Sequence, residues 1–156
     1  RSMHVLANAL GPAGICGGQV LDTDGQSMDD SPDFPWKVTR QKTAVLLRAS
    51  ILSGAILAGA DGKSLAALGA YGDHLGSAFQ IVDDILDVTS TAEELGKTPG
   101  KDESQNKRTF VAAYGLEKAR ELAARESRLA SVALEGVRGD TAFFSDLSDY
   151  LCERTK

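Results

Sequence analysis

The chain has 156 residues, of which 42% are hydrophobic and 25% charged, and its formal net charge is −5. This length allows a core to form without disulfides or metals, and the composition excludes a disordered or low-complexity chain. Acidic and basic residues are spread along the whole chain, which argues against a nucleic-acid partner, because such a partner requires a concentrated basic face.

Cysteines and apolar runs indicate the compartment. Cys16 and Cys152 are the only cysteines and lie far apart, so neither a disulfide framework nor a zinc site is indicated. Arg48 and Ser53 interrupt the apolar stretch 44–60, and no basic segment precedes an apolar run at the N-terminus. We therefore predict a cytoplasmic protein with neither an integral membrane segment nor a signal peptide.

Helical periodicity dominates the sequence. Ala and Leu recur at three- and four-residue spacing, whereas period-two alternation of β-branched and aromatic residues is almost absent, so we predict an all-α fold. The predicted helices span residues 2–21, 36–60, 63–89, 105–114, 116–137 and 140–154. Turn-forming residues predict surface loops over 24–35 and 91–107.

Two N-terminal segments hold glycines and prolines. Residues 11–18 of the first predicted helix include four glycines, each of which weakens a helix by up to ~1 kcal/mol relative to Ala, so their number suggests close approach by a neighbouring element. In the following loop, DDSPD over 29–33 has the spacing of a paired-carboxylate motif. Pro32 and Pro35 exclude a helix there, so we do not expect this segment to bind metal.

The central feature is an acidic cluster within an apolar helix, FQIVDDILD over 79–87. Asp83 and Asp87 are four residues apart and Asp84 and Asp87 three apart, so a helix places their carboxylates on one side. Three like charges then repel one another, and Mg²⁺ is the obvious compensating ion because it prefers oxygen ligands and combines one or two carboxylates with substrate phosphates. The alternative is that the aspartates only cap or solubilise a helix end.

Lysines and glycines follow the acidic cluster. Lys97 lies ten residues after Asp87, and Lys101 and Lys107 belong to the same loop. Lysine binds phosphate as a point charge, and glycine lets the backbone approach it closely, so the loop suits a phosphate group. A loop of this composition is weak evidence by itself.

Four segments occur in a fixed order: GGQVLD over 17–22, QKTAVLLRAS over 41–50, FQIVDDILD over 79–87 and GKTPGKDESQNKRTF over 96–110. This ordered set resembles the trans-isoprenyl diphosphate synthases, particularly bacterial farnesyl and geranylgeranyl diphosphate synthases, and the likeness extends to the C-terminus. The resemblance implies that residues 1–156 are the C-terminal half of a single polyprenyl synthase domain. It further implies an isoprenoid synthase helical bundle in which two aspartate-rich motifs face each other across a deep cavity.

The resemblance also implies roles for individual residues. Lys42 alone is more simply explained as an exposed helix charge, but the resemblance places it against the allylic diphosphate. The implied metal ligands are Asp83, Asp84 and Asp87, with Mg²⁺ as the cofactor. The implied catalytic residues are Lys42, Thr43, Gln80, Asp83 and Lys97. The implied substrate-binding residues are Gln19, Asp22, Lys42, Thr43, Gln80, Lys97 and Lys107, with Asp102 in the closing loop.

The function implied by the resemblance is condensation of isopentenyl diphosphate with an allylic diphosphate. The allylic diphosphate ionises, the double bond of isopentenyl diphosphate attacks the carbocation, and a proton is lost. Mg²⁺ and lysine stabilise the departing diphosphate. The GKTPGKD segment over 96–102 favours a farnesyl product. The resemblance implies a homodimer, and because the first aspartate-rich motif is absent from this sequence, we expect the isolated chain to be inactive.

Two other functions remain open. A terpene cyclase-like protein also ionises allylic diphosphates, but such proteins usually use Asn, Ser or Thr and Glu as metal ligands, unlike DDILD over 83–87. A non-catalytic or regulatory subunit of a heteromeric prenyl synthase would keep the fold without the full chemistry. Such a subunit need not retain the aspartates and lysines that this chain retains.

Overall fold

The computed structural model describes residues 1–24, 29, 31–89 and 107–153, and every element in these ranges is helical, which confirms the all-α prediction. The elements are α1 (Ser2–Leu10), α2 (Ile15–Thr23), α3 (Phe34–Thr39), the π-helical turn η2 (Arg40–Ala44), α4 (Val45–Leu57), α5 (Gly62–Thr89), α8 (Phe110–Tyr114), α9 (Leu116–Leu134) and α10 (Ala142–Glu153).

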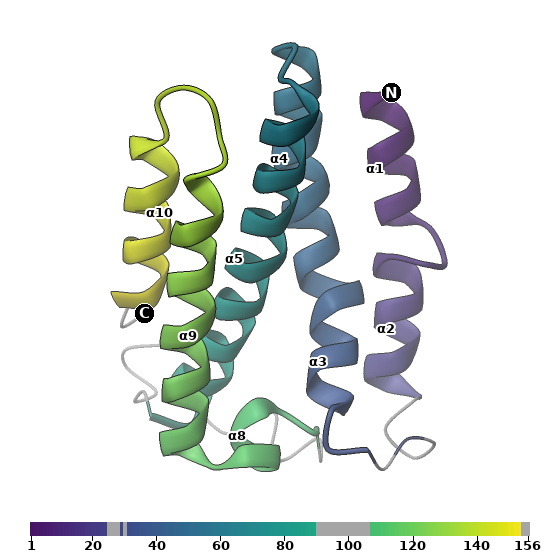
Figure 1. Cartoon of the computed structure of the whole chain (residues 1–156). Helices are drawn as coiled ribbons and strands as arrows, with labels where there is room; N and C mark the ends of the chain where they lie inside the picture. The colour runs from purple at the N-terminus through teal and green to yellow at the C-terminus, as the bar shows by residue number, and fades with distance from the viewer. Residues whose placement is uncertain (25–28, 30, 90–106, 154–156) are drawn as a thin grey trace.

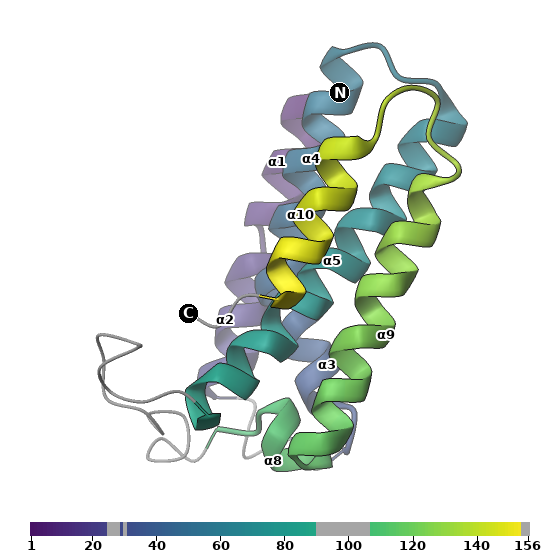
Figure 2. The same cartoon turned by 90° about the vertical axis from the view of Figure 1, so that its left-hand side faces the viewer.

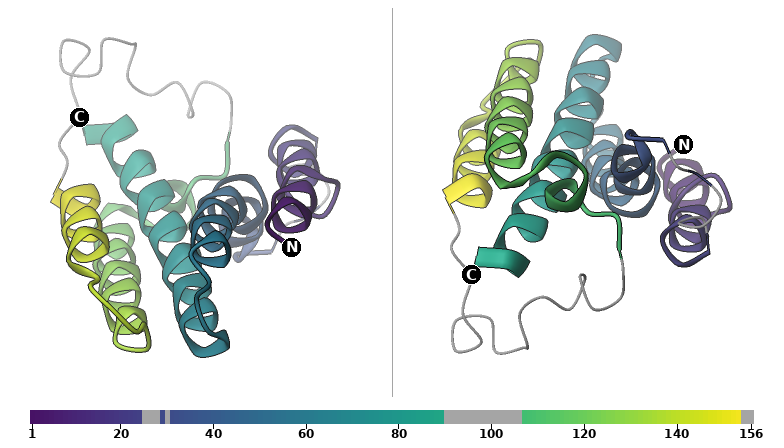
Figure 3. Two further views of the ribbon diagram at one scale, coloured as in Figure 1. Left: turned by 90° about the horizontal axis from the view of Figure 1, so that it is seen from above. Right: turned by 90° about the horizontal axis from the view of Figure 1, so that it is seen from below.

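The long helices stand side by side (Figure 1). At one edge of the bundle, α1 and α2 follow each other and pack against the rod formed by α3, η2 and α4. The long helix α5 packs against this rod on one side and against α9 on the other. Figure 2 shows α10 alongside α5 and α9, and the view from below in Figure 3 shows the short helix α8 across the end of the bundle. None of the helices in the described residues is long and apolar enough to cross a membrane.

The predicted helix over 2–21 is wrong, because the chain breaks into α1 and α2. Gly11 is extended, with φ −78° and ψ −171°. The ring of Pro12 disfavours the α conformation for the residue before it and supplies no N–H to continue the helix. The proline therefore ends α1 and gives α2 its own direction.

The other predicted helices differ from the structure mainly at their ends. The segment 36–60 begins earlier, at Phe34, because Pro35 suits a first helical turn, and it ends at Leu57. Helix α5 begins one residue before its prediction, and Asp61 Oδ1 accepts a hydrogen bond from the Ser64 N–H at 2.7 Å there. The helix predicted over 105–114 instead begins at Phe110, the helix predicted over 116–137 ends at Leu134, and the helix predicted over 140–154 begins later, at Ala142.

Two apolar clusters form the core on either side of the middle of α5. The first lies near the end of α5 and joins it to α8 and α9; its buried members are Ile81, Val82, Leu86, Phe110, Ala119, Leu122 and Ala123. The second joins α4, α5 and α9; its buried members are Leu52, Leu68, Tyr71, Leu75, Ala130 and Leu134. Burial of a large apolar side chain contributes about 1.5–3 kcal/mol. The first cluster therefore fixes the part of α5 that carries the aspartates.

Candidate active site

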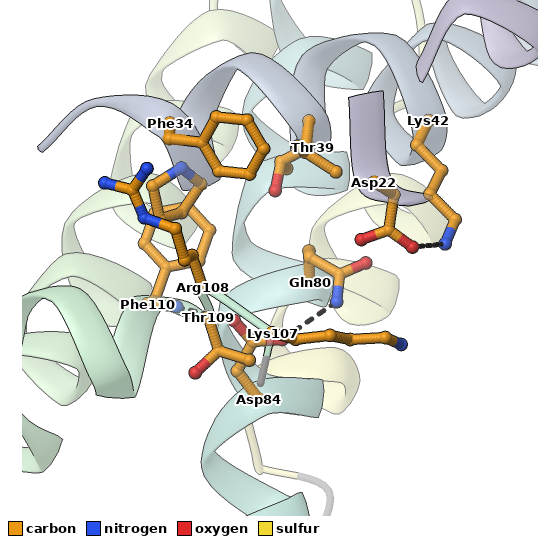
Figure 4. A pocket seen from close by; sticks show the side chains of 12 residues that line it. Asp22, Phe34, Thr39, Lys42, Gln80, Asp84, Lys107, Arg108, Thr109 and Phe110 are labelled. Carbon is orange, nitrogen blue, oxygen red and sulfur yellow. Dashed lines mark hydrogen bonds and ion pairs between the residues drawn. The ribbon is translucent and has the colours of Figure 1, made fainter. Parts of the chain in front are cut away.

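A cavity of about 70 Å³ lies where α2, α3, η2, α5 and the segment 107–110 meet (Figure 4). Its lining residues are Asp22, Phe34, Pro35, Val38, Thr39, Lys42, Gln80, Asp84, Lys107, Arg108, Thr109 and Phe110. Five of them belong to the residue set predicted from the sequence: Asp22, Lys42, Gln80, Asp84 and Lys107. These five come from four separate segments of the chain, so the fold brings them together.

The turn η2 carries two of the predicted residues, Lys42 and Thr43. Single π-helical turns are rare and occur frequently at functional sites. Helices α2 and α5 both approach the backbone of this turn at glycines. A Cβ added to Gly18 would lie 2.4 Å from Lys42 N, and one added to Gly76 would lie 2.4 Å from Ala44 Cα. The close approach predicted for the glycine-rich segment is therefore confirmed at Gly18.

Lys42 pairs with Asp22 across the contact between η2 and α2. Lys42 Nζ lies 2.5 Å from Asp22 Oδ2, and the two side chains are 34% and 15% exposed. Asp22 stands one helical turn beyond Gly18, so the glycine contact brings its carboxylate to the lysine. Lys42 is thus a partly buried member of the cavity wall and not a freely solvated helix charge.

A line of hydrogen bonds connects η2 to α5 and α8. Thr43 Oγ1 donates to Gln80 Oε1 at 2.8 Å, and Gln80 Nε2 donates to Asp84 Oδ1 at 2.9 Å. The Phe110 N–H donates to Asp84 Oδ2 at 2.8 Å. Gln80 therefore supports the acidic cluster through Asp84, and it also holds Thr43 in place.

The three predicted metal ligands differ in their surroundings. Asp84 and Asp87 are buried, with 5% and 6% of their surface exposed, whereas Asp83 is intermediate. Asp84 lines the cavity and turns toward Gln80 and α8. In the described part of the chain, no group of three or more His, Cys, Asp or Glu side chains is arranged to hold a metal ion. The assignment of all three aspartates as ligands stays a prediction.

The remaining predicted residues have different positions relative to the cavity. Gln19 is exposed on α2 and does not line the cavity. Lys107 lines the cavity wall from the segment that precedes α8. The predictions for Lys97, Lys101 and Asp102 lie outside the described residues.

Sequence reasoning missed the part of the cavity wall that follows Lys107. The Arg108 guanidinium donates hydrogen bonds to the carbonyl oxygens of Asp29 and Ser31, the latter at 3.0 Å, and its Cζ lies 5.0 Å from the centre of the Phe34 ring. Thr109 Oγ1 accepts a hydrogen bond from the Ala112 N–H at 3.1 Å and caps α8. A threonine before the apolar run FVAAY is a typical helix N-cap, so this signal was present in the sequence.

Asp29, the first residue of the paired-carboxylate sequence over 29–33, has a structural role, and the expectation that this segment binds no metal stays a prediction. Asp29 lies outside any helix, accepts a hydrogen bond from the Ser31 N–H at 2.9 Å and pairs with Lys37 at 2.6 Å. The hydrogen bond from Lys37 lowers the pKa of Asp29 to about 2. Asp29 thus anchors the start of α3, while Asp30 lies outside the described residues.

Residues 1–133 match the model of the polyprenyl synthetase family, and the chain belongs to this family. It is 40% identical over 158 residues to the farnesyl diphosphate synthase of Escherichia coli, and the match covers 97% of this chain and 52% of that protein. The family resemblance seen in the four sequence segments is thereby confirmed. The chain spans about half the length of the curated relatives that it matches.

Solved structures place the helices in the isoprenoid synthase fold. A polyprenyl synthase from Caulobacter crescentus, complexed with calcium and isoprenyl diphosphate, superposes with a TM-score of 0.87 at 25% identity and covers 99% of this chain and 59% of that one. A geranyltransferase from Helicobacter pylori, complexed with magnesium and isoprenyl diphosphate, has a TM-score of 0.79 at 29% identity, with 96% and 49% covered. The predicted fold class is confirmed.

Proposed function

We propose that this chain forms one wall of a Mg²⁺-dependent prenyltransferase site that condenses isopentenyl diphosphate with an allylic diphosphate, giving farnesyl or geranylgeranyl diphosphate. The observation that carries the proposal is the gathering of Lys42 and Lys107 with Asp22 and Asp84 in one cavity. Membership of the polyprenyl synthetase family supports the same reaction. Because the chain spans about half the length of its relatives, the activity of a whole enzyme is part of the proposal.

Lys42 and Lys107 are the groups proposed to bind the allylic diphosphate. They approach the cavity from different elements, so a diphosphate between them contacts two positive charges. Lys42 is held by Asp22 in this structure, and a diphosphate, which carries more negative charge than one carboxylate, competes for its ammonium group. Negative charge grows on the diphosphate as the allylic bond breaks, and cations already in position stabilise it. Lys97 belongs to the proposal with the same role.

Asp83 and Asp87 are the residues proposed to hold Mg²⁺. They lie one helical turn apart on α5, and their carboxylates supply the hard oxygen ligands that this ion prefers. Two carboxylates are sufficient, because Mg²⁺ completes its octahedral coordination with waters and substrate phosphate oxygens. When bound, the ion supplies Lewis-acid stabilisation of the leaving phosphate. The complex of the Helicobacter pylori geranyltransferase with magnesium and isoprenyl diphosphate supports this choice of metal.

Product length, assembly and location are finer parts of the proposal. The identity to a farnesyl diphosphate synthase agrees with the farnesyl product favoured by the segment 96–102. The homodimer implied by the resemblance and the cytoplasmic location predicted from the cysteines and apolar runs remain predictions. Light scattering coupled to size-exclusion chromatography tests the first, since a dimer doubles the mass of 16.4 kDa expected for one chain.

A chimera tests the proposed reaction. In it, this chain replaces the matching half of the Escherichia coli farnesyl diphosphate synthase, and the product is measured from radiolabelled isopentenyl diphosphate and geranyl diphosphate. We expect Mg²⁺-dependent product formation that falls roughly 10²–10³-fold in Lys42→Met, because the leaving group loses a fixed cation. Lys118→Met is the matched control, since Lys118 is an exposed lysine of α9 paired with Glu121. A folded chimera without product would favour a non-catalytic subunit and contradict the proposal.

A further inference from the structure

Asp84 differs from its neighbour Asp83 in the direction that it faces. Consecutive residues of an α-helix are about 100° apart around the axis, so the two carboxylates cannot point the same way. Asp84 is buried, with 5% of its surface exposed, whereas Asp83 is intermediate. A shared acidic motif therefore contains two side chains in different environments.

Both carboxylate oxygens of Asp84 accept hydrogen bonds from the protein. Oδ1 accepts from Gln80 Nε2 at 2.9 Å, and Oδ2 accepts from the Phe110 N–H at 2.8 Å. Phe110 is the first residue of α8, where a backbone N–H has no partner within the helix. Asp84 satisfies this donor from a position 26 residues earlier in the sequence.

The bond to Phe110 lies where the chain rejoins the bundle. The Phe110 side chain is fully buried, and its ring meets Trp36 edge to face with the centroids 4.7 Å apart. Lys107, three residues earlier, lines the cavity. Because Asp84 fixes the backbone of Phe110, it also limits where Lys107 can lie relative to α5.

We propose that Asp84 is a positioning residue that clamps the start of α8 to α5 and thereby sets Lys107 at the cavity, while Asp83 faces the metal. The metal-binding role of Asp83 rests on the proposed function. Both oxygens of Asp84 already accept hydrogen bonds within the protein, which suits a positioning role better than coordination of Mg²⁺, an ion that requires near-octahedral geometry and retains several waters. The hydrogen bond from the Phe110 N–H to the ionised Asp84 carboxylate is charge-assisted, which makes the clamp stronger than a neutral one.

The variants Asp84→Ala and Asp84→Asn separate the clamp from a ligand role. Asparagine can still accept from the Phe110 N–H through its carbonyl, and a flipped Gln80 amide can accept from the new NH₂ group while donating to Thr43. Alanine removes both bonds. We expect hydrogen exchange of the Phe110 amide in this chain to accelerate roughly 10- to 100-fold in Asp84→Ala and less than about fivefold in Asp84→Asn.

Calorimetric titration with inorganic diphosphate, with and without Mg²⁺, is run on the same variants. The clamp predicts that Asp84→Asn keeps the Mg²⁺-dependent gain in affinity. The metal assignment in the proposed function predicts that Asp83→Asn loses it. Loss of that gain in Asp84→Asn, or unchanged Phe110 exchange in Asp84→Ala, would overturn the clamp. If Asp83→Asn also keeps the gain, the metal assignment in the proposed function fails, while accelerated exchange in Asp84→Ala still supports the clamp.

A wild-type measurement covers the case in which Asp84→Ala does not fold. A scalar coupling across the hydrogen bond, between Phe110 ¹⁵N and the Asp84 carboxyl ¹³C, reports the contact directly by NMR. The structure predicts that the coupling is observed, because the N–H to Oδ2 contact is 2.8 Å. Its absence in a spectrum that resolves the Phe110 amide would contradict the clamp.

Discussion

Thr43 Oγ1 donates a hydrogen bond to Gln80 Oε1 at 2.8 Å, and this contact links the π-helical turn to α5. Gln80 uses its other end to donate to Asp84. One neutral amide therefore joins a residue of the π-helical turn η2 to a residue of the acidic cluster. An amide suits this place because it offers an acceptor to the hydroxyl and a donor to the carboxylate.

Gln80→Leu tests this link. Leucine has a similar volume and leaves the Thr43 hydroxyl and the Asp84 carboxylate each without one partner, so we expect the free energy of unfolding to fall by about 1–3 kcal/mol. Urea unfolding followed by circular dichroism measures the change. Gln19→Leu is the matched control on the exposed side of α2, with an expected change within about 0.5 kcal/mol. Equal effects of the two substitutions would contradict the link.

Gly18→Ala tests the close contact between α2 and η2. The added methyl group would lie 2.4 Å from Lys42 N, so helix α2 must shift, and we expect a loss of about 1–3 kcal/mol in unfolding free energy. Gly54→Ala is the control, because a Cβ on Gly54 of α4 meets nothing within 4 Å, and alanine should stabilise that helix by up to about 1 kcal/mol. A neutral Gly18→Ala would show that the contact is looser than described.

Lys37→Met tests the acid sensitivity of the chain before α3. The hydrogen bond from Lys37, together with those from Ser31, lowers the pKa of Asp29 from 3.8 to about 2, so the native state holds the ionised form more strongly than the unfolded chain does. This contribution to stability is fully present above pH 3.8 and is lost as the pH falls toward 2. In Lys37→Met we expect the Asp29 pKa to rise toward 3.8, as measured by NMR titration of its carboxyl carbon. An unchanged pKa would exclude the pairing in solution.

The helices themselves were largely predictable from local signals. The apolar periodicity around residues 63–89 and the Asp61-Gly62 turn placed α5 to within one residue of its start, because capping and periodicity are local properties. The break at Gly11-Pro12 was also visible locally, and a helix drawn through a proline was the error. Other predicted helix ends differ from the observed ones by a few residues, because fraying and capping decide where a helix ends.

The geometry of the site was less predictable. Gly18 and Gly76 approach the turn η2 from two other helices. The glycine-rich segment 11–18 predicts a close contact at Gly18, but no local pattern identifies η2 as its partner or marks Gly76. The family resemblance indicated Lys42 and Gln80, and the structure brings them to one cavity. The family resemblance did not indicate the orientation of Asp84. Its partner at Phe110 is a backbone N–H, and a backbone donor leaves no side-chain signature in the sequence.

Calorimetric titration of inorganic diphosphate into wild-type chain and into the single variants Asp83→Asn and Lys42→Met tests the central claim most directly. We predict that Mg²⁺ tightens binding to the wild type by at least roughly tenfold, because a bound cation offsets the charge of carboxylate and diphosphate together. Asp83→Asn should lose this gain, and Lys42→Met should weaken binding with and without the ion. Equal affinity with and without Mg²⁺, or a gain that persists in Asp83→Asn, would contradict a metal-dependent diphosphate site on this chain.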